Sequence, residues 1–377
     1  MTTSVLMPID LRKPLTCGVA LLQFLAAFIC VLFRICSSDK VPAVFVFGDS
    51  LLDSGNNNYL VSFAKADYNP NGIDFGGPSG RFTNGRTIAD ILANELGLSF
   101  IPPYMAPTTQ ASAILKGVNY ASGGGGILLH TGQMWVGRIN MDSQIDNFEN
   151  NRQDMISMMG DSAAQDLLKK AIFIVSLGSN DFLSNYIAPT VTSPAERDLI
   201  SPQVFVASMA STFRQQLTRL FNLGARKFMV ANVGPIGCIP SQRDINPGAG
   251  DGCVSFPNQL AQSFNSQLKS LVEKLNKNLQ GSIYVFADSY RIMQDVLQNY
   301  KAYGFENSDS SCCHLAGRFG GLIPCFPEST VCEDRSKYVF WDAFHPSEAA
   351  NMVVAKRMLD GDANDIWPMN VRKLSQA

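Results

Sequence analysis

Short apolar runs alternate with helical patterns along most of the chain, and this alternation constrains the fold more than any other feature. Five runs rich in β-branched residues lead into turns bearing Gly, Asn or Asp and predict buried strands at 43–47, 117–121, 171–177, 227–233 and 282–287. Amphipathic segments predict helices, clearest at 87–95, 203–221, 258–279 and 289–299, with a last helix at 346–359. This order is typical of an α/β fold, with a parallel sheet covered by helices on both faces.

Composition predicts one folded domain and argues against a polyanionic partner. The chain has 377 residues, 46% of them hydrophobic, and a formal net charge of -2. It can therefore bury a full core, and it has no excess positive charge of the kind that binds nucleic acid. A segment rich in Gly, Pro and Cys at 303–338 predicts a long ordered loop, but no shift in composition marks a second domain. We expect a single domain over residues 39–377.

The N-terminus has the pattern of a cleaved secretory signal. Arg12 and Lys13 precede the almost wholly apolar run Gly18 to Phe33, which ends in small residues near Ser38. The run is shorter than the roughly 20 residues of a membrane-spanning helix, and it contains Gln23. We predict a signal peptide at 1–38, a secreted mature protein and no stable membrane insertion after cleavage, with a retained signal anchor as the alternative.

Cysteine usage agrees with export. Removal of the signal leaves six cysteines, an even number that in an exported chain predicts disulfides: Cys238, Cys253, Cys312, Cys313, Cys325 and Cys332. Cys238 and Cys253 flank a loop rich in Pro and Gly and can pair across it, whereas the pairing of the other four stays open. Free buried thiols are the alternative. No CxxC pair or neighbouring His pair accompanies the cysteines, so no metal site is predicted.

The turn after the first predicted strand contains a candidate nucleophile. In the stretch VFVFGDSLLDSGNNN, Ser50 follows the strand and is expected to begin the next helix. A hydroxyl at that position lies at the positive end of a helix, where backbone N–H groups can stabilise an oxyanion. A capped turn without catalytic function explains the same residues, so this motif needs support from the others.

Two later turns offer hydrogen-bond donors. The glycines of GVNYASGGGGIL let the backbone approach a bound group closely and present its N–H groups, although a flexible loop would also explain them. In IVSLGSNDF, the side-chain amide of Asn180 can donate to a developing negative oxygen, and Asp181 is expected to hold the turn. The chain has neither GxGxxG nor a Walker pattern, which disfavours a dinucleotide or nucleoside triphosphate site.

A candidate general base lies near the C-terminus, in the stretch VFWDAFHPSE. Asp342 precedes His345 by three residues, so its carboxylate can accept the Nδ1 hydrogen and leave Nε2 free to take a proton from a serine. His130 and His314, the other two histidines, lie in a Gly-rich and a Cys-rich loop without a carboxylate so placed. A nucleophile, oxyanion donors and a base are therefore all present.

With these motifs the sequence resembles the GDSL esterase/lipase family of the SGNH hydrolase superfamily, and most closely its secreted plant branch. The resemblance covers nearly the whole chain after the signal. It rests on FVFGDSLLDSGNNN, GVNYASGGGGI, GSND and DAFHP, and also on the intervening stretches GRFTNGR and NVGPIGCIP. It implies a three-layer α/β/α sandwich with a flavodoxin-like parallel sheet. No GxSxG motif is present, which argues against an α/β-hydrolase lipase.

The resemblance also implies roles for single residues. Ser50 would be the nucleophile and a backbone oxyanion donor, Asn180 a side-chain donor, and His345 the base that Asp342 orients. Gly126 would give the remaining oxyanion N–H, with Gly123 or Gly124 as alternatives. The reaction implied is hydrolysis of a small-molecule or polymer-linked ester through an acyl-enzyme, with no metal or organic cofactor.

Two other functions are compatible with such a fold. A secreted protein that holds a lipid or glycan without turnover would use the same cleft, but it would not need Ser50, His345 and Asp342 together. A flavin-binding electron carrier would need a phosphate loop that the sequence lacks. The sequence does not distinguish fatty-acyl esters from acetylated or feruloylated polysaccharides as substrates.

Overall fold

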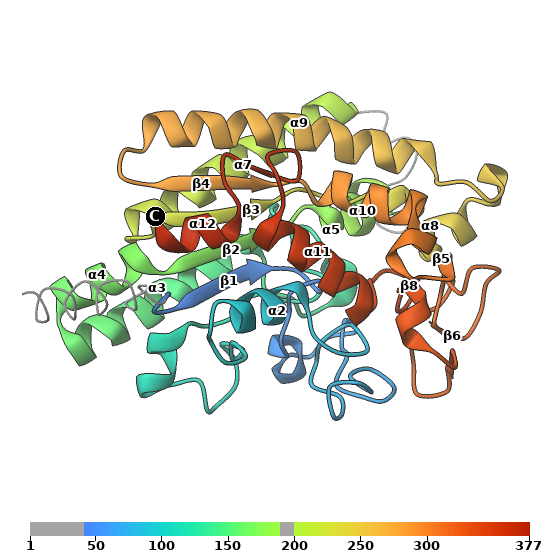
Figure 1. Ribbon diagram of the computed structural model, residues 1–377, viewed down its shortest axis with the longest axis horizontal. Coiled ribbons are helices and arrows are strands. Elements are labelled where there is room, and N and C mark those ends of the chain that lie inside the picture. The colour runs from blue at the N-terminus through green and yellow to red at the C-terminus, as the bar shows by residue number, and fades with distance from the viewer. Residues whose placement is uncertain (1–40, 189–199) are drawn as a thin grey trace, which may run out of the picture. The chain divides into compact units, whose positions relative to one another are not determined.

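A five-stranded sheet forms the centre of the fold in the computed structural model, which describes residues 41–188 and 200–377 (Figure 1). The signal peptide predicted at 1–38 lies outside the described residues. The strand order is β1-β2-β3-β4-β9, in which β1 to β4 are parallel and β9 is antiparallel to β4. The strands are β1 (Val44–Gly48), β2 (Ile172–Ser176), β3 (Lys227–Ala231), β4 (Ile283–Ala287) and β9 (Ile366–Trp367).

The strand predicted at 117–121 is an extended segment that runs beside β1 without forming a full ladder. Asn119 makes an isolated parallel bridge to Val46. The N–H of Val46 donates to the carbonyl of Val118 at 3.0 Å, and the N–H of Tyr120 donates back to Val46 at 2.8 Å. With this segment as second element, the order is the 2-1-3-4-5 of a flavodoxin-like sheet, so the predicted fold class is confirmed. The two-residue strand β9 was not predicted because it is too short to show a period.

Alternation within each strand sends side chains to two separate cores. In β1 the valines Val44 and Val46 pack into one core, whereas Phe45 and Phe47 pack into the other. The other three parallel strands divide their side chains between the same two cores. The strands are therefore apolar on both faces, as expected for a sheet between two helical layers.

Helices cover both faces of the sheet (Figure 1). The core that contains Phe45 is closed by side chains of α3 (Met141–Met159), α4 (Asp161–Lys170), α7 (Pro202–Asn222) and α9 (Ser255–Asn278). The core that contains Val44 is closed by α2 (Ile88–Glu95), α10 (Ser289–Gln298), α11 (Glu348–Asp360) and α12 (Val371–Gln376). In the described part of the chain, no helix is long and apolar enough to cross a bilayer.

The five predicted helices are confirmed to within about three residues at their ends. The helices α3 and α4, which precede β2, were not predicted. In α3 the buried face includes Gln144 and Asn151 beside Ile145 and Phe148, so polar residues interrupt the apolar period that marks a helix in the sequence.

A row of aromatic rings crosses the four parallel strands on one face. Phe45, Phe173, Phe228 and Tyr284 are register partners on adjacent strands. Their ring centroids lie 5.1, 5.6 and 4.1 Å apart in that order. Each aromatic contact is worth about 1 kcal/mol beyond the area it buries, so the row helps to fix the register of the sheet.

The region predicted as a long loop contains short strands and two disulfides. The strands are β5 (Asn307–Ser311), β6 (Cys313–His314), β7 (Thr330–Val331) and β8 (Tyr338–Phe340). All six predicted cysteines are paired, as Cys238–Cys253, Cys312–Cys332 and Cys313–Cys325. The pair Cys238–Cys253 confirms that these residues bridge their loop. Trp341 is buried against the other two disulfides.

Candidate active site

The predicted site residues meet at the carboxyl edge of the sheet. Gly48, Ser176 and Ala231, which end β1, β2 and β3, lie in one row of register partners. Parallel strands end at the same edge, so the turns that follow them are brought together. Ser50 follows β1 by two residues, and Asn180 follows β2 by four.

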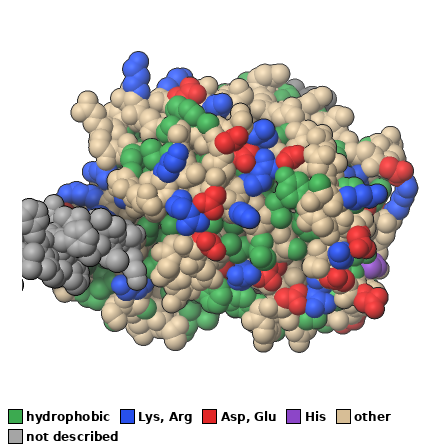
Figure 2. Space-filling view, viewed as in Figure 1, with side chains coloured by type: hydrophobic (Ala, Val, Ile, Leu, Met, Phe, Trp, Pro, Cys, Tyr) green, Lys and Arg blue, Asp and Glu red, His purple; other side chains and the backbone are tan. Residues whose placement is uncertain are grey.

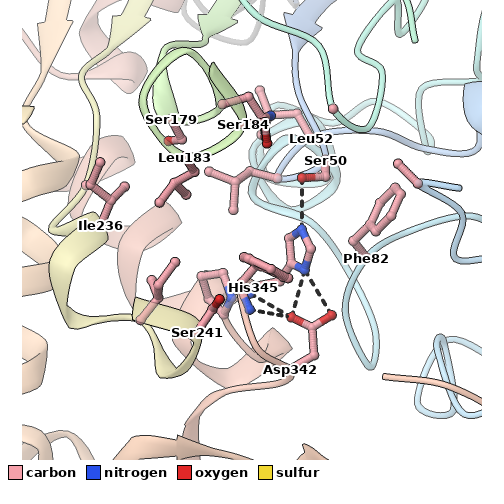
Figure 3. Close-up of a pocket in the computed structure, with 18 of the residues that line it drawn as sticks. Ser50, Leu52, Phe82, Ser179, Leu183, Ser184, Ile236, Ser241, Asp342 and His345 are labelled. Atoms are coloured by element: carbon pink, nitrogen blue, oxygen red, sulfur yellow. Dashed lines mark hydrogen bonds and ion pairs between the residues drawn. The ribbon is translucent and has the colours of Figure 1, made fainter. Parts of the chain in front are cut away.

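A hydrogen-bonded chain joins Ser50, His345 and Asp342 (Figure 3). The Oγ of Ser50 lies 2.8 Å from Nε2 of His345, although 295 residues separate them in sequence. Nδ1 of His345 lies 2.8 Å from Oδ1 of Asp342 and 3.0 Å from Oδ2. A carboxylate can only accept, so the shared proton belongs to Nδ1, and Nε2 is left to accept from the serine hydroxyl.

Backbone donors fix the carboxylate of Asp342. The N–H groups of Phe344 and His345 donate to its Oδ1 at 2.9 and 2.8 Å, in addition to the imidazole. Asp342 and His345 are both buried, at 3% and 7% exposure. The imidazole is therefore oriented by an acceptor that is itself held by the backbone, which limits reorganisation during a proton transfer.

The nucleophile turn differs from the prediction that Ser50 begins a helix. Residues 49–53 make a single turn, in which the N–H of Asp53 donates to the carbonyl of Asp49, and a short 3-10 helix follows only at Asn56–Tyr59. Within the described residues, the N–H of Ser50 makes no hydrogen bond. It stays available to a ligand, as the predicted role requires.

The glycine run places four successive N–H groups in different settings. The N–H of Gly123 donates to Asp53 and that of Gly125 to Ser122, so both are occupied. Gly124 has a positive φ of 78°, lines the same cavity as Ser50, and makes no N–H hydrogen bond to any described residue. Among the glycines weighed as oxyanion donors, Gly124 has the geometry of a donor to a ligand in the cavity.

Gly126, the donor chosen from the resemblance, lies away from the cavity lining. A β-carbon at Gly126 would lie 2.3 Å from Cγ2 of Thr131 and 2.8 Å from Oδ2 of Asp181. Close packing against these two side chains explains a glycine at this position without an oxyanion role. The four consecutive glycines look alike in sequence, and only their backbone conformations separate them.

The amide of Asn180 is oriented by its neighbours. Its Nδ2 donates to the carbonyl of Gly125 at 3.1 Å, and its Oδ1 accepts from Oγ of Ser184 at 3.2 Å. Ser184 in turn accepts from the indole N–H of Trp135 at 3.2 Å. Nδ2 keeps one hydrogen without an acceptor among the described residues, and Asn180 lines the cavity. Sequence reasoning missed Ser184 and Trp135, which carry no motif of their own.

Two buried carboxylates accept hydrogen bonds from the backbone at the two ends of the glycine run. Asp53 accepts from the N–H of Gly123 at 3.0 Å, and Asp181 accepts from the N–H groups of Ile127 and Leu128, both at 2.9 Å. Burial raises the pKa of both carboxyls from 3.8 to about 6, while these N–H donors act in the opposite direction. Burial also raises the pKa of Asp49, beside the nucleophile, to about 6. These contacts give Asp181 a structural role, but its carboxylate holds the loop that follows the glycine run and not its own turn.

A largely apolar cavity of about 740 Å³ opens over these groups. Ser50, Gly124, Asn180 and His345 line it together, and Leu183 and Ile236 face the triad from the opposite side (Figure 3). His130 and His314 do not line the cavity. In the part of the chain that the structure describes, no group of three or more His, Cys, Asp or Glu side chains is arranged to hold a metal ion.

Comparison with known proteins gives one family. The family model of GDSL-like lipases/acylhydrolases matches residues 44–358. The chain is 57% identical over 362 residues to the GDSL esterase/lipase At4g16230 of Arabidopsis thaliana, covering 94% of this chain and 98% of the relative. It is 49% identical over 338 residues to the Arabidopsis GDSL esterase/lipase At2g23540, covering 88% of this chain and 87% of the relative.

The raised pKa of Asp181 predicts how stability depends on pH. At pH values between 3.8, the ordinary pKa of an Asp, and about 6, Asp181 keeps a proton in the folded protein that it has lost in the unfolded chain. The free energy of unfolding should therefore fall as pH rises through this window. Asp181→Asn removes this contribution, so the decrease between about pH 4 and about pH 7 should shrink by about 1 to 3 kcal/mol.

Urea unfolding at several pH values measures this slope. Asp166→Asn is the control, because Asp166 lies on α4 with 66% of its side chain exposed. An unchanged slope in Asp181→Asn would contradict the assignment of a raised pKa to this carboxyl.

Proposed function

The chain belongs to the family of GDSL-like lipases and acylhydrolases and is a carboxylic ester hydrolase, and from this premise we propose that Ser50, His345 and Asp342 carry its reaction. The observation that carries the proposal is the 2.8 Å contact between Oγ of Ser50 and Nε2 of His345 inside an apolar cavity. The imidazole is held at Nδ1 by Asp342. This is the arrangement by which a serine is activated in acyl transfer.

In the proposed reaction the hydroxyl of Ser50 attacks the ester carbonyl and its proton passes to Nε2 of His345. The imidazolium then returns that proton to the leaving alcohol, and an acyl-enzyme remains. Water, deprotonated by the same nitrogen, attacks the acyl-enzyme, and the imidazolium then gives this proton to Oγ of Ser50 as the acid is released. No metal or organic cofactor takes part in these steps.

We assign the oxyanion to three donors: the N–H of Ser50, the N–H of Gly124 and the side-chain amide of Asn180. Gly124 takes the place expected for Gly126, because Gly124 lines the cavity and Gly126 does not, while the N–H groups of both have no acceptor among the described residues. Donors fixed before the reaction stabilise the tetrahedral intermediate without reorganisation. Asn180 meets this condition through its bonds to Gly125 and Ser184.

The cavity favours esters with a large apolar acyl group. Its volume of about 740 Å³ is far larger than an acetyl group needs, and apolar side chains such as Phe63, Leu183 and Ile236 dominate its lining. Transfer of hydrocarbon into such a lining gains about 0.8 kcal/mol per methylene. A lipid-like acyl chain gains more from this cavity than an acetyl group on a polysaccharide.

A binding protein without turnover would have the cavity but would not need the triad. Nothing in holding a lipid or glycan calls for a serine within 2.8 Å of an imidazole that is fixed by a buried carboxylate. On the face seen in Figure 2, Lys and Arg side chains are mixed with Asp and Glu, and no broad patch of one sign appears. We therefore propose a small or polymer-linked ester as the partner, and no nucleic acid.

We also propose that residues 1–38 are a secretory signal and that the mature protein is a single secreted domain from residue 39 onward. The support is the sequence pattern, with Arg12 and Lys13 before the apolar run. Three disulfides in the described chain fit an oxidising compartment.

The triad and oxyanion assignments predict the effects of two substitutions. Ser50→Ala should reduce hydrolysis of p-nitrophenyl butyrate to background, and Asn180→Ala should lower kcat by about 100-fold to 1000-fold. Ser54→Ala is the control, since Ser54 comes directly after the turn that carries Ser50 and its hydroxyl has no hydrogen-bond partner among the described residues. Circular dichroism and thermal melting would establish that the variants fold. Activity retained in Ser50→Ala would refute the mechanism.

The cavity assignment predicts a chain-length effect at Gly234, which lines the cavity. A β-carbon there would meet nothing within 4 Å, and the backbone has no positive φ, so a side chain can be added without strain. Gly234→Leu should lower kcat/KM for p-nitrophenyl palmitate about tenfold more than for the acetate. Gly248→Leu, equally unhindered but outside the cavity, should change neither. Equal effects on both esters would argue against an acyl chain beside Gly234.

The signal assignment predicts the N-terminus of the mature protein. Expression of the whole chain in a eukaryotic host should yield secreted protein that begins near Ser38, as N-terminal sequencing would measure. Leu25→Arg places a charge inside the apolar run and should keep the protein inside the cell. Secretion of an uncleaved chain would contradict a signal peptide.

A further inference from the structure

The segment Gly80 to Arg86, GRFTNGR, lies between the nucleophile turn and the loop that carries His345. The reaction scheme gives this segment no part. Resting on the proposed function, we propose that it is a positioning segment, in which Phe82 and Thr83 hold the imidazole of His345 against Ser50.

One end of the segment is fixed to the nucleophile turn. Arg81 is buried and forms a two-pronged ion pair with Asp90 of α2, with contacts of 2.7 and 2.8 Å. Its remaining nitrogen, Nη1, donates to the carbonyl of Ser54 at 3.4 Å. Asp90 also closes the capping box of α2 through Thr87. Arg81 thus joins the segment both to a helix and to Ser54, the residue directly after the nucleophile turn.

The other end of the segment is bonded to the residues that follow His345. The hydroxyl of Thr83 donates to the carbonyl of Pro346 at 3.0 Å. The N–H of Glu348, at the start of α11, donates to Oδ1 of Asn84 at 2.8 Å. Arg86 forms an ion pair with the carboxylate of Glu348. These contacts fix the backbone that follows His345, whereas Asp342 holds the imidazole itself.

Phe82 lies between the two ends and contacts the imidazole itself. Its ring centroid lies 5.2 Å from that of His345, with the planes 35° apart, and Figure 3 shows the ring beside the imidazole. The same ring packs on the glycine run, where a β-carbon on Gly123 would lie 2.6 Å from its Cζ. The ring of Phe82 therefore fills the space beside the imidazole. Without this ring, the imidazole could rotate into that space and away from Ser50.

A proton transfer between Oγ and Nε2 depends steeply on their separation, and a displacement of about 1 Å costs about 100-fold in rate. His345 reaches Ser50 from a loop that is not part of the central sheet, so the sheet alone does not set the 2.8 Å contact. The segment GRFTNGR is bonded both beside the nucleophile turn and after His345, and it therefore sets this distance directly.

Thr83→Val tests the proposal with little change in shape, and Phe82→Leu tests the ring. Each should lower kcat for p-nitrophenyl butyrate at least about tenfold, and in Thr83→Val KM should change less than about twofold, because Thr83 does not line the cavity. Thr83→Ser restores the hydroxyl and should recover most of the rate. Thr109→Val is the matched control, because Thr109 is also buried and donates to a proline carbonyl, that of Pro103, outside the cavity.

A fluorophosphonate that labels an activated serine separates this proposal from the proposed function. In Thr83→Val, labelling of Ser50 should be slower to the same degree as kcat but should reach the same final stoichiometry as in the wild type. Wild-type rates of labelling and turnover in both Thr83→Val and Phe82→Leu would overturn the positioning role and leave the triad standing. Failure of the wild type to label at Ser50 would instead refute the proposed function.

Discussion

The parallel register of β1, β2 and β3 is the constraint on which the site depends. Because Gly48, Ser176 and Ala231 end in one row, the turns that carry Ser50 and Asn180 emerge side by side. The aromatic row through Phe45 and Phe173 lies in the same register and helps to prevent slippage. A slip of one residue would exchange the faces of a strand and carry its following turn away from the site.

Buried polar contacts then convert neighbouring turns into one fixed surface. Asn56 donates to the carbonyls of Asn119 and Ala121, and Asn57 donates to that of Gly123, so the nucleophile turn is tied to the glycine run. These side chains are buried and would be costly if unpaired. Asn56 and Asn57 thus position the backbone that we propose to present donors to the oxyanion.

The sequence was informative wherever a signal is local. A strand followed by a turn fixed the place of Ser50 and Asn180, and the spacing of Asp342 and His345 anticipated their contact, because all these relations lie within a few residues. The 2.8 Å contact between Ser50 and His345 spans 295 residues, so the chemistry of the two side chains and the family resemblance suggested the pairing, but no local pattern did. The conformation that separates Gly124 from Gly126 depends on tertiary packing, to which a run of identical residues gives no clue. The helix α3 was not predicted because its buried face carries polar residues, which only the tertiary structure shows to be buried.

The proposed base is held differently from the proposed nucleophile, and this difference follows from topology. Ser50 follows a central strand directly, whereas Asp342 follows β8, which pairs with β5 outside the main sheet. The backbone beside Asp342 is therefore fixed from elsewhere: the N–H of Cys313 donates to the carbonyl of Trp341 at 2.7 Å, and that indole packs on two disulfides. The disulfides on one side and GRFTNGR on the other supply the rigidity that the sheet gives to Ser50. A triad drawn from a sheet turn and a peripheral loop needs such supports, since either loop alone leaves the distance between serine and imidazole unset.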